Sequence, residues 1–160
     1  MKLTIRCSLL ITLFAGLLVY LPPSSAATII ITDLEDVEFG DLPPTSALVT
    51  QRIRICVNST PPGPYRLTAL GLTTTGAFEL VNEAPQTITY VVHASTRRNG
   101  LGAPLVAGVP RTGFNSRQSN AGGRCLPPWL WITVMVTEQE LQQAPGGRYW
   151  GTLQITVAPE

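Results

Sequence analysis

The C-terminal residues 146–160 carry the pattern that most constrains the fold of this chain. They read GGRYWGTLQITVAPE, and from Tyr149 to Val157 every second residue is apolar or glycine. The residues between them, including Thr152 and Gln154, are mostly polar. This period of two predicts a strand with one buried face. Such a strand needs a neighbour on each side, and whether this chain supplies both is the main functional question.

The N-terminal residues predict an export signal. Lys2 and Arg6 precede an apolar run over 9–21, which is followed by two prolines and the small residues 24–27. This order is typical of a secretory signal peptide, here residues 1–26. A membrane span needs about 20 apolar residues, so we disfavour the alternative of a retained membrane anchor. Cys7 precedes the apolar run and is expected to leave with the signal.

Removal of the signal leaves residues 27–160, enough for a single domain with its own core. This part has nine arginines, no lysine and ten acids. A nearly neutral balance gives no reason to expect nucleic acid or a membrane surface as a partner.

Two cysteines remain, Cys56 and Cys125. In an oxidising compartment they are best interpreted as one disulfide, worth about 4 kcal/mol in the chain-entropy model. The alternative is two free or metal-bound thiols. It is disfavoured because the chain has one histidine and no closely spaced cysteine pair. The alternation of the surrounding residues places Cys56 on the outer, polar face of its strand.

The chain is rich in short segments with strand character. Strands are predicted at 28–34, 47–57, 65–69, 77–81, 87–94, 130–136 and 149–157. Thr137 and Glu140 fit a capping box before one helical turn at 141–144. Tyr149 follows this turn, as in the tyrosine corner of immunoglobulin-like sandwiches. These features predict an all-β sandwich.

Residues 97–128 differ from the rest, with many Gly, Asn, Ser, Pro and Arg residues. One interpretation is a surface loop available for contact. The other is two short strands with turns, including a weak strand near 105–109. Both remain open at this stage.

No catalytic constellation is present in the sequence. His93 stands alone on the outer face of a predicted strand, and no Gly-x-Ser-x-Gly elbow exists, which disfavours a hydrolase. Apolar residues interrupt the acids of 33–41 at strand spacing, which favours a solvated face over a calcium site. We therefore expect no enzyme, no cofactor and no metal.

Several segments together resemble pilus subunits of the chaperone-usher pathway, and the nearest branch is the spore coat protein U-like, or archaic, pilins. The segments that carry this resemblance are Phe39-Gly40, Ile53 to Val57, Tyr65 to Leu67, Thr89 to Val92 and Gly146 to Leu153. The order and spacing of these segments carry the likeness, which spans nearly all of residues 27–160.

The resemblance implies an incomplete immunoglobulin-like fold that lacks its final strand. In that family a periplasmic chaperone supplies the missing strand, an outer-membrane usher directs assembly, and a neighbouring subunit then replaces the chaperone. We call any strand supplied in this way a donor strand. Here Tyr149, Leu153, Ile155 and Val157 would line its groove at the subunit interface. The protein would pass from the periplasm to the cell surface as part of a fimbrium and would serve in adhesion.

Residues 28–34 depart from the family pattern, because few residues separate the expected cleavage point from Phe39. Either this segment is itself a donor strand, using Ile29, Ile31 and Leu34, or it is the first strand and the subunit donates nothing. The second case would suit a fibre tip. The bridge departs from the family pattern as well, because Cys125 lies far along the chain instead of near the first strand.

A missing strand would matter energetically. Burial of four large apolar side chains is worth roughly 6 to 12 kcal/mol, which is similar to the net stability of a whole domain, about 5 to 15 kcal/mol. The alternative function is a self-sufficient secreted or periplasmic binding module with a complete sandwich, whose basic loop contacts an acidic ligand.

Overall fold

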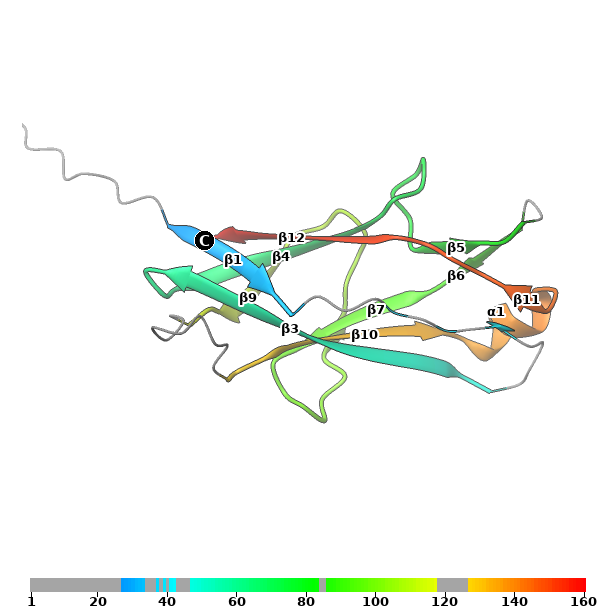
Figure 1. Ribbon diagram of the computed structural model, residues 1–160, viewed down its shortest axis with the longest axis horizontal. Coiled ribbons are helices and arrows are strands. Elements are labelled where there is room, and N and C mark those ends of the chain that lie inside the picture. The colour runs from blue at the N-terminus through cyan, green and yellow to red at the C-terminus, as the bar shows by residue number, and fades with distance from the viewer. Residues whose placement is uncertain are drawn as a thin grey trace, which may run out of the picture.

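The fold is an all-β sandwich of two layers with one short helix (Figure 1). The computed structural model describes residues 27–33, 37, 39, 41–42, 47–83, 86–117 and 127–160. The predicted signal peptide, residues 1–26, lies outside this part. Within the described residues no helix is long and apolar enough to span a membrane.

The first layer is a five-stranded antiparallel sheet in the order β1-β3-β10-β7-β8. Its strands are β1 (Thr28–Thr32), β3 (Val49–Thr60), β10 (Leu130–Val136), β7 (Val91–Ser95) and β8 (Ala103–Pro104). The alternation predicted for 47–57 and 130–136 is confirmed, because Ile53 pairs with Ile132 and Ile55 with Leu130 across the two central strands.

The second layer is built on three strands in the order β12-β4-β9. They are β12 (Leu153–Pro159), β4 (Pro64–Gly71) and β9 (Arg111–Asn115). The hairpin of β5 (Glu79–Val81) and β6 (Thr87–Thr89) extends this layer, because Val81 and Trp150 exchange backbone hydrogen bonds of 2.8 and 2.9 Å. Two short strands, β2 (Asp41–Leu42) and β11 (Gly147–Arg148), pair with each other.

The core lies between the layers and consists mainly of the inward-facing residues of the longer strands. Its fully buried members include Ile55, Leu67, Val92, Ile132 and Val136. Tyr65 of β4 and Phe114 of β9 stack with ring centroids 5.5 Å apart. The inner faces of the central strands therefore form one continuous apolar core.

One predicted strand, 87–94, is two strands in the structure. β6 pairs with β5 in the second layer, whereas β7 pairs with β10 in the first. The change occurs at Tyr90, whose N–H donates to the carbonyl of Phe78 and whose ring stacks on Phe78. Ile88, Tyr90 and Val92 are all buried, so the switch between layers leaves the alternation unchanged.

The described part of 97–128 contains two short strands with turns, which agrees with the second of the two interpretations. β8 lies beside β7, and Leu105 continues that contact by donating its N–H to Val92 O at 2.7 Å. Gly108 then donates to Ala69 O of β4 at 2.9 Å. The chain thus crosses from the first layer to the second here. The weak strand predicted near 105–109 is wrong in position, because the strands are β8 and β9.

The outer face of the first layer is partly covered, which corrects one expectation. His93, predicted to be a surface residue, is only 9% exposed, and its Nδ1 lies 3.2 Å from Gly102 O. Cys56, whose parity places it on the outer face of β3, is fully buried. The turn after β7 covers His93, so the burial of this residue depends on a segment outside its own strand.

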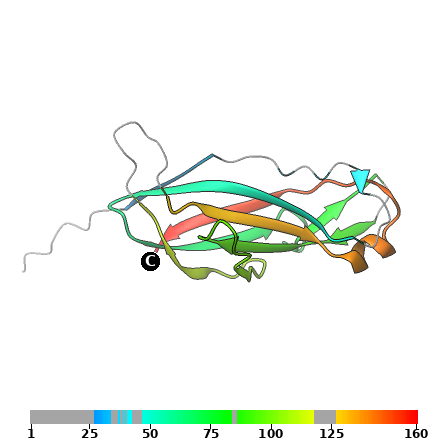
Figure 2. The same ribbon diagram turned by 90° about the horizontal axis from the view of Figure 1, so that it is seen from below.

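The helix α1 (Glu138–Gln143) forms the corner before the last strand, at the end of the sandwich opposite the C-terminus (Figures 1 and 2). Thr137 caps it by accepting from Glu140 N, as predicted, but the Glu140 carboxylate accepts from Thr89 N instead of completing the capping box. The Tyr149 hydroxyl donates to Pro145 O at 2.9 Å, which is the geometry of a tyrosine corner.

Candidate functional site

The two layers are not joined along one of their long edges. β1 is the edge strand of the first layer and β12 is the edge strand of the second, and no described strand lies between them. The two strands come close at the end where the chain terminates (Figure 1). We call this side of the sandwich, formed by β1 and β12, the open edge.

The backbone of β12 has one unpaired side at the open edge. Thr152 O accepts from Leu72 N at 2.9 Å, and Glu160 N donates to Pro64 O at 3.2 Å. These are hydrogen-bonded pairs in the register that joins β12 to β4, and such pairs alternate along antiparallel strands. The even-numbered residues of β12 therefore bond to β4. The N–H and C=O groups of Leu153, Ile155 and Val157 point the other way.

The side chains at the open edge are apolar but incompletely buried. Ile29 and Ile31 of β1 and Leu153, Ile155 and Val157 of β12 all pack against the core while remaining half-exposed. Their neighbours one strand inward, such as Leu67 and Ala69 of β4, are fully buried. The core thus reaches the surface along this edge, beside a row of free backbone groups.

The far end of the open edge is closed by a short strand pair. Gly147 and Arg148 of β11 pair with Leu42 and Asp41 of β2, and Leu42 is 2% exposed. Val37 and Phe39 pack half-buried against the core. The open edge on the side of β12 is thus seven residues long, from Leu153 to Pro159.

The structure brings together three of the four residues predicted to line the groove. Leu153, Ile155 and Val157 lie on one face of β12 at the open edge. Tyr149 is 7% exposed and belongs to the core cluster, and its role in a subunit interface stays a prediction.

The predicted donor segment lies at the same edge. Ile29 and Ile31 belong to β1, which pairs with β3 of the same chain over Thr28–Thr32. Leu34, the third residue of that prediction, lies outside the described residues. The choice between donor strand and first strand is not tested by this pairing alone.

The predicted bridge is half described. Cys56 is disulfide-bonded, whereas Cys125 lies outside the described residues, so the identity of its partner stays a prediction. The described residues contain no group of three or more metal-ligating side chains.

The signal that sequence reasoning missed is the packing of Val37 and Phe39 against the core. Both are apolar residues within an acidic stretch, and we used their strand spacing only to argue against a calcium site. The apolar positions inside it were the available clue.

Comparisons with known proteins support the fold. No protein-family model matches the chain, and no curated protein matches it in sequence. A chain from a solved chaperone-tip adhesin complex of CFA/I fimbriae biogenesis has a TM-score of 0.58 and 15% identity, over 82% of this chain and 41% of that one.

A chain from the chaperone-tip adhesion subunit complex of archaic Csu pili of Acinetobacter baumannii has a TM-score of 0.43 and 16% identity, over 82% and 39%. The present chain spans less than half the length of either matched chain. The likeness to the first establishes a fold shared with a chain of a chaperone-tip adhesin complex.

Proposed function

We propose that this chain is a structural subunit of a pilus or fimbrium that is completed by a donor strand at its open edge. The observation that carries the proposal is the coincidence of unpaired backbone and half-buried apolar side chains along β12. Strand addition needs both, because main-chain hydrogen bonds provide affinity and side-chain pockets provide specificity. The fold shared with a chain of a fimbrial complex supports it.

The proposal includes the partners and route that the resemblance implies. A periplasmic chaperone would cover the open edge after export, an outer-membrane usher would direct assembly, and a neighbouring subunit would provide the final strand. Export rests on the signal pattern of residues 1–26. Membership of the spore coat protein U-like branch, adhesion and the Cys56–Cys125 bridge belong to the same proposal.

We further propose that β1 is the first strand of the sandwich rather than a donor. Its pairing with β3 over Thr28–Thr32 supports this assignment, as does the packing of Ile29 and Ile31 against the core of their own chain. Deletion of residues 28–32 should then destabilise the subunit itself. A deletion variant with unchanged stability that fails only to extend a fibre would instead identify the segment as a donor.

A pair of peptides tests the proposed function through its backbone requirement. One is a seven-residue strand peptide of alternating Val and Thr, matched to the length of β12. The control has the same side chains but is N-methylated at alternate residues on the edge that would face β12. We expect only the unmethylated peptide to bind, because the control cannot donate to the carbonyls of Leu153, Ile155 and Val157. Equal binding of both peptides would contradict strand addition.

A self-sufficient binding module is the alternative, and it requires a sandwich that needs no added strand. Arg97 and Arg98, directly after β7, favour a role in binding an acidic ligand. The two functions are distinguished by whether the chain alone is a stable monomer.

A further inference from the structure

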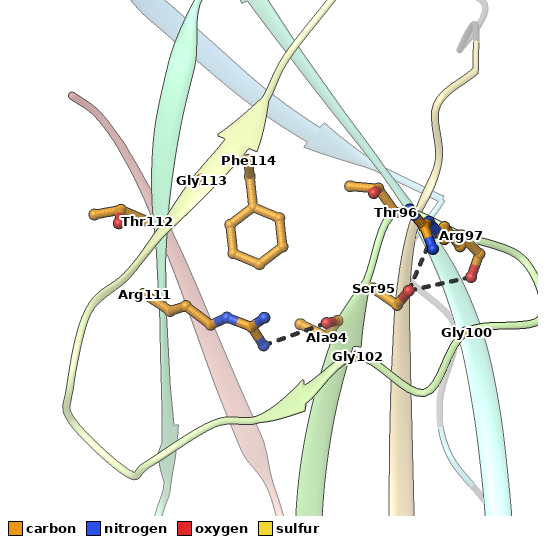
Figure 3. A pocket seen from close by; sticks show the side chains of 10 residues that line it. All are labelled: Ala94, Ser95, Thr96, Arg97, Gly100, Gly102, Arg111, Thr112, Gly113 and Phe114. Carbon is orange, nitrogen blue, oxygen red and sulfur yellow. Dashed lines mark hydrogen bonds between the residues drawn. The ribbon is translucent and has the colours of Figure 1, made fainter.

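A pocket lies on the opposite side of the sandwich from the open edge, between the turn that follows β7 and strand β9 (Figure 3). Its volume is about 300 Å³, and its lining includes Ser95, Arg97, Gly100, Arg111, Thr112 and Phe114. We call it the basic pocket. Its size is at the lower end of the range for small-molecule sites.

The lining of the basic pocket has positive charge, and one acid, Glu160, contacts it from outside by accepting a hydrogen bond from Gly113 N at 3.3 Å. Arg97 comes from the turn after β7 and Arg111 from the first position of β9, and none of the ten lining residues is Asp or Glu. Two arginines from different elements thus face one small volume. A guanidinium matches a planar carboxylate with two parallel hydrogen bonds.

Arg111 is held in place before any ligand arrives. Its Nη1 donates to Ala103 O at 2.6 Å and to Ala94 O at 3.4 Å, and its guanidinium carbon lies 5.5 Å from the centroid of the Phe114 ring. Phe114 is itself buried and stacked on Tyr65. Within the described residues the Arg111 Nη2 has no hydrogen-bond partner. The side chain is therefore oriented, with donors still available.

The opposite wall of the pocket is also fixed. Ser95 Oγ hydrogen-bonds to both the N–H and the carbonyl of Arg97, at 3.1 and 3.2 Å. Arg52 of β3 reaches over the sheet and donates through Nη2 to Arg97 O at 3.1 Å and to Gly100 O at 2.8 Å. These contacts fix the turn that carries Arg97. The Arg97 guanidinium makes no hydrogen bond within the described part of the chain.

We infer that the basic pocket binds a small carboxylate that also has hydroxyl groups, the chemistry of an acidic monosaccharide. The arginines would hold the carboxylate, and the lining hydroxyls of Thr96 and Thr112 would bond to the hydroxyls of the ligand. This inference goes beyond the proposed structural role and does not depend on it, because the pocket and the open edge lie on opposite sides of the fold.

The test is a titration of the exported chain, labelled with ¹⁵N and with its donor peptide bound, with D-glucuronate and with D-glucose. The two sugars differ in the carboxylate, so we expect shifts for residues of the turn and of β9 with glucuronate only. Arg97→Gln should weaken glucuronate binding at least about tenfold, since a hydrogen bond to a charged group is lost. Arg111→Lys, which keeps the charge but not the planar fork, should weaken it as well.

Arg98→Gln is the matched control, because Arg98 is an exposed neighbour outside the lining and the variant loses the same charge. It should bind glucuronate as the unmodified chain does. If both Arg97→Gln and Arg98→Gln weakened glucuronate binding equally, the binding would come from general charge attraction. That result would contradict a specific site at the basic pocket. Equal shifts with glucose, or equally strong binding of inorganic phosphate, would contradict the ligand class. The near-UV circular dichroism of each variant verifies that its fold is retained.

Discussion

The two long sides of the sandwich contain similar apolar residues but are completed in different ways. On the side of β8 and β9, the chain crosses between layers, with Leu105 bonded to Val92 of one sheet and Gly108 bonded to Ala69 of the other. Leu105 is consequently 6% exposed. On the side of β1 and β12 no described strand makes that crossing, and Leu153 and Ile155 stay half-exposed.

The difference shows that apolar side chains alone do not close an edge of the sandwich. Backbone hydrogen bonds to a further segment are needed as well. Arg111 adds a further tie on the closed side, joining β9 to Ala103 O of β8. On the open edge the equivalent hydrogen-bonding groups of β12 face away from β4. The comparison predicts that substitutions on the closed side alter the stability of the chain, whereas those on the open edge alter its capture of a donor strand.

The largest effect is expected for Ile155→Asp. The half-exposed position tolerates a carboxylate while it is open to water, but a bound donor strand would bury that charge without a partner. Donor-peptide binding and chaperone capture should be abolished, while export continues. Thr156→Asp is the matched control, since Thr156 is exposed on the other face of β12. Normal fibres from Ile155→Asp would contradict the assignment of the open edge.

Leu105→Ala should have the next largest effect, on stability and not on donor binding. Loss of a buried leucine costs about 2 to 5 kcal/mol, measured by urea unfolding of the chain with its donor peptide bound. Leu101→Ala, at an exposed leucine of the same segment, should change the free energy of unfolding by no more than about 0.5 kcal/mol. If Leu105→Ala weakened donor-strand affinity instead, it would contradict the claim that the closed side determines stability and the open edge determines donor binding.

A smaller effect is expected for Tyr149→Phe at the corner that leads into β12. The variant loses the hydrogen bond to Pro145 O, which is worth about 0.5 to 1.5 kcal/mol. Thermal unfolding of the donor-bound protein should show this loss. Unchanged stability would mean that the corner contributes nothing to the placement of the strand.

The last effect appears only at alkaline pH and concerns the pH dependence of the core between the two sides. Burial raises the pKa of Tyr90 to about 12, from an ordinary value of 10.0. The folded state therefore binds the phenolic proton more tightly, so stability is fully present below pH 10 and falls as the pH rises towards 12. Tyr90→Phe should reduce this alkaline loss in urea unfolding midpoints. A variant with the same alkaline loss would assign it to other groups.

Much of the fold follows from local alternation, which is why β3, β4 and β10 were predicted near their observed positions. The last strand, predicted over 149–157, begins only at Leu153, because Trp150 pairs with Val81 of β5 and not with β4. The break at Tyr90 was not predictable, because a strand that passes from one layer to the other keeps the same residues facing the core. Val106 and Val109 misled the prediction for 105–109, since both valines are largely exposed. The strand propensity of a valine does not show whether its side chain is exposed.

The candidate site could be predicted in part. Leu153, Ile155 and Val157 follow from their period, because all three lie on one face of one strand. The period could not predict how exposed these side chains are, because their exposure depends on whether another segment covers β12. The burial of His93 depends in the same way on the turn after β7. The joint placement of Arg97 and Arg111 depends on the crossing at β8, which no local pattern indicated.

The most direct test is to export the chain without any partner and to compare it, by size-exclusion chromatography and limited proteolysis, with the same chain given a synthetic donor strand. We expect the chain alone to aggregate or be degraded, and the added strand to produce a protease-resistant monomer. A chain that is a resistant monomer on its own, and that does not change when the strand is added, would contradict the account of the open edge.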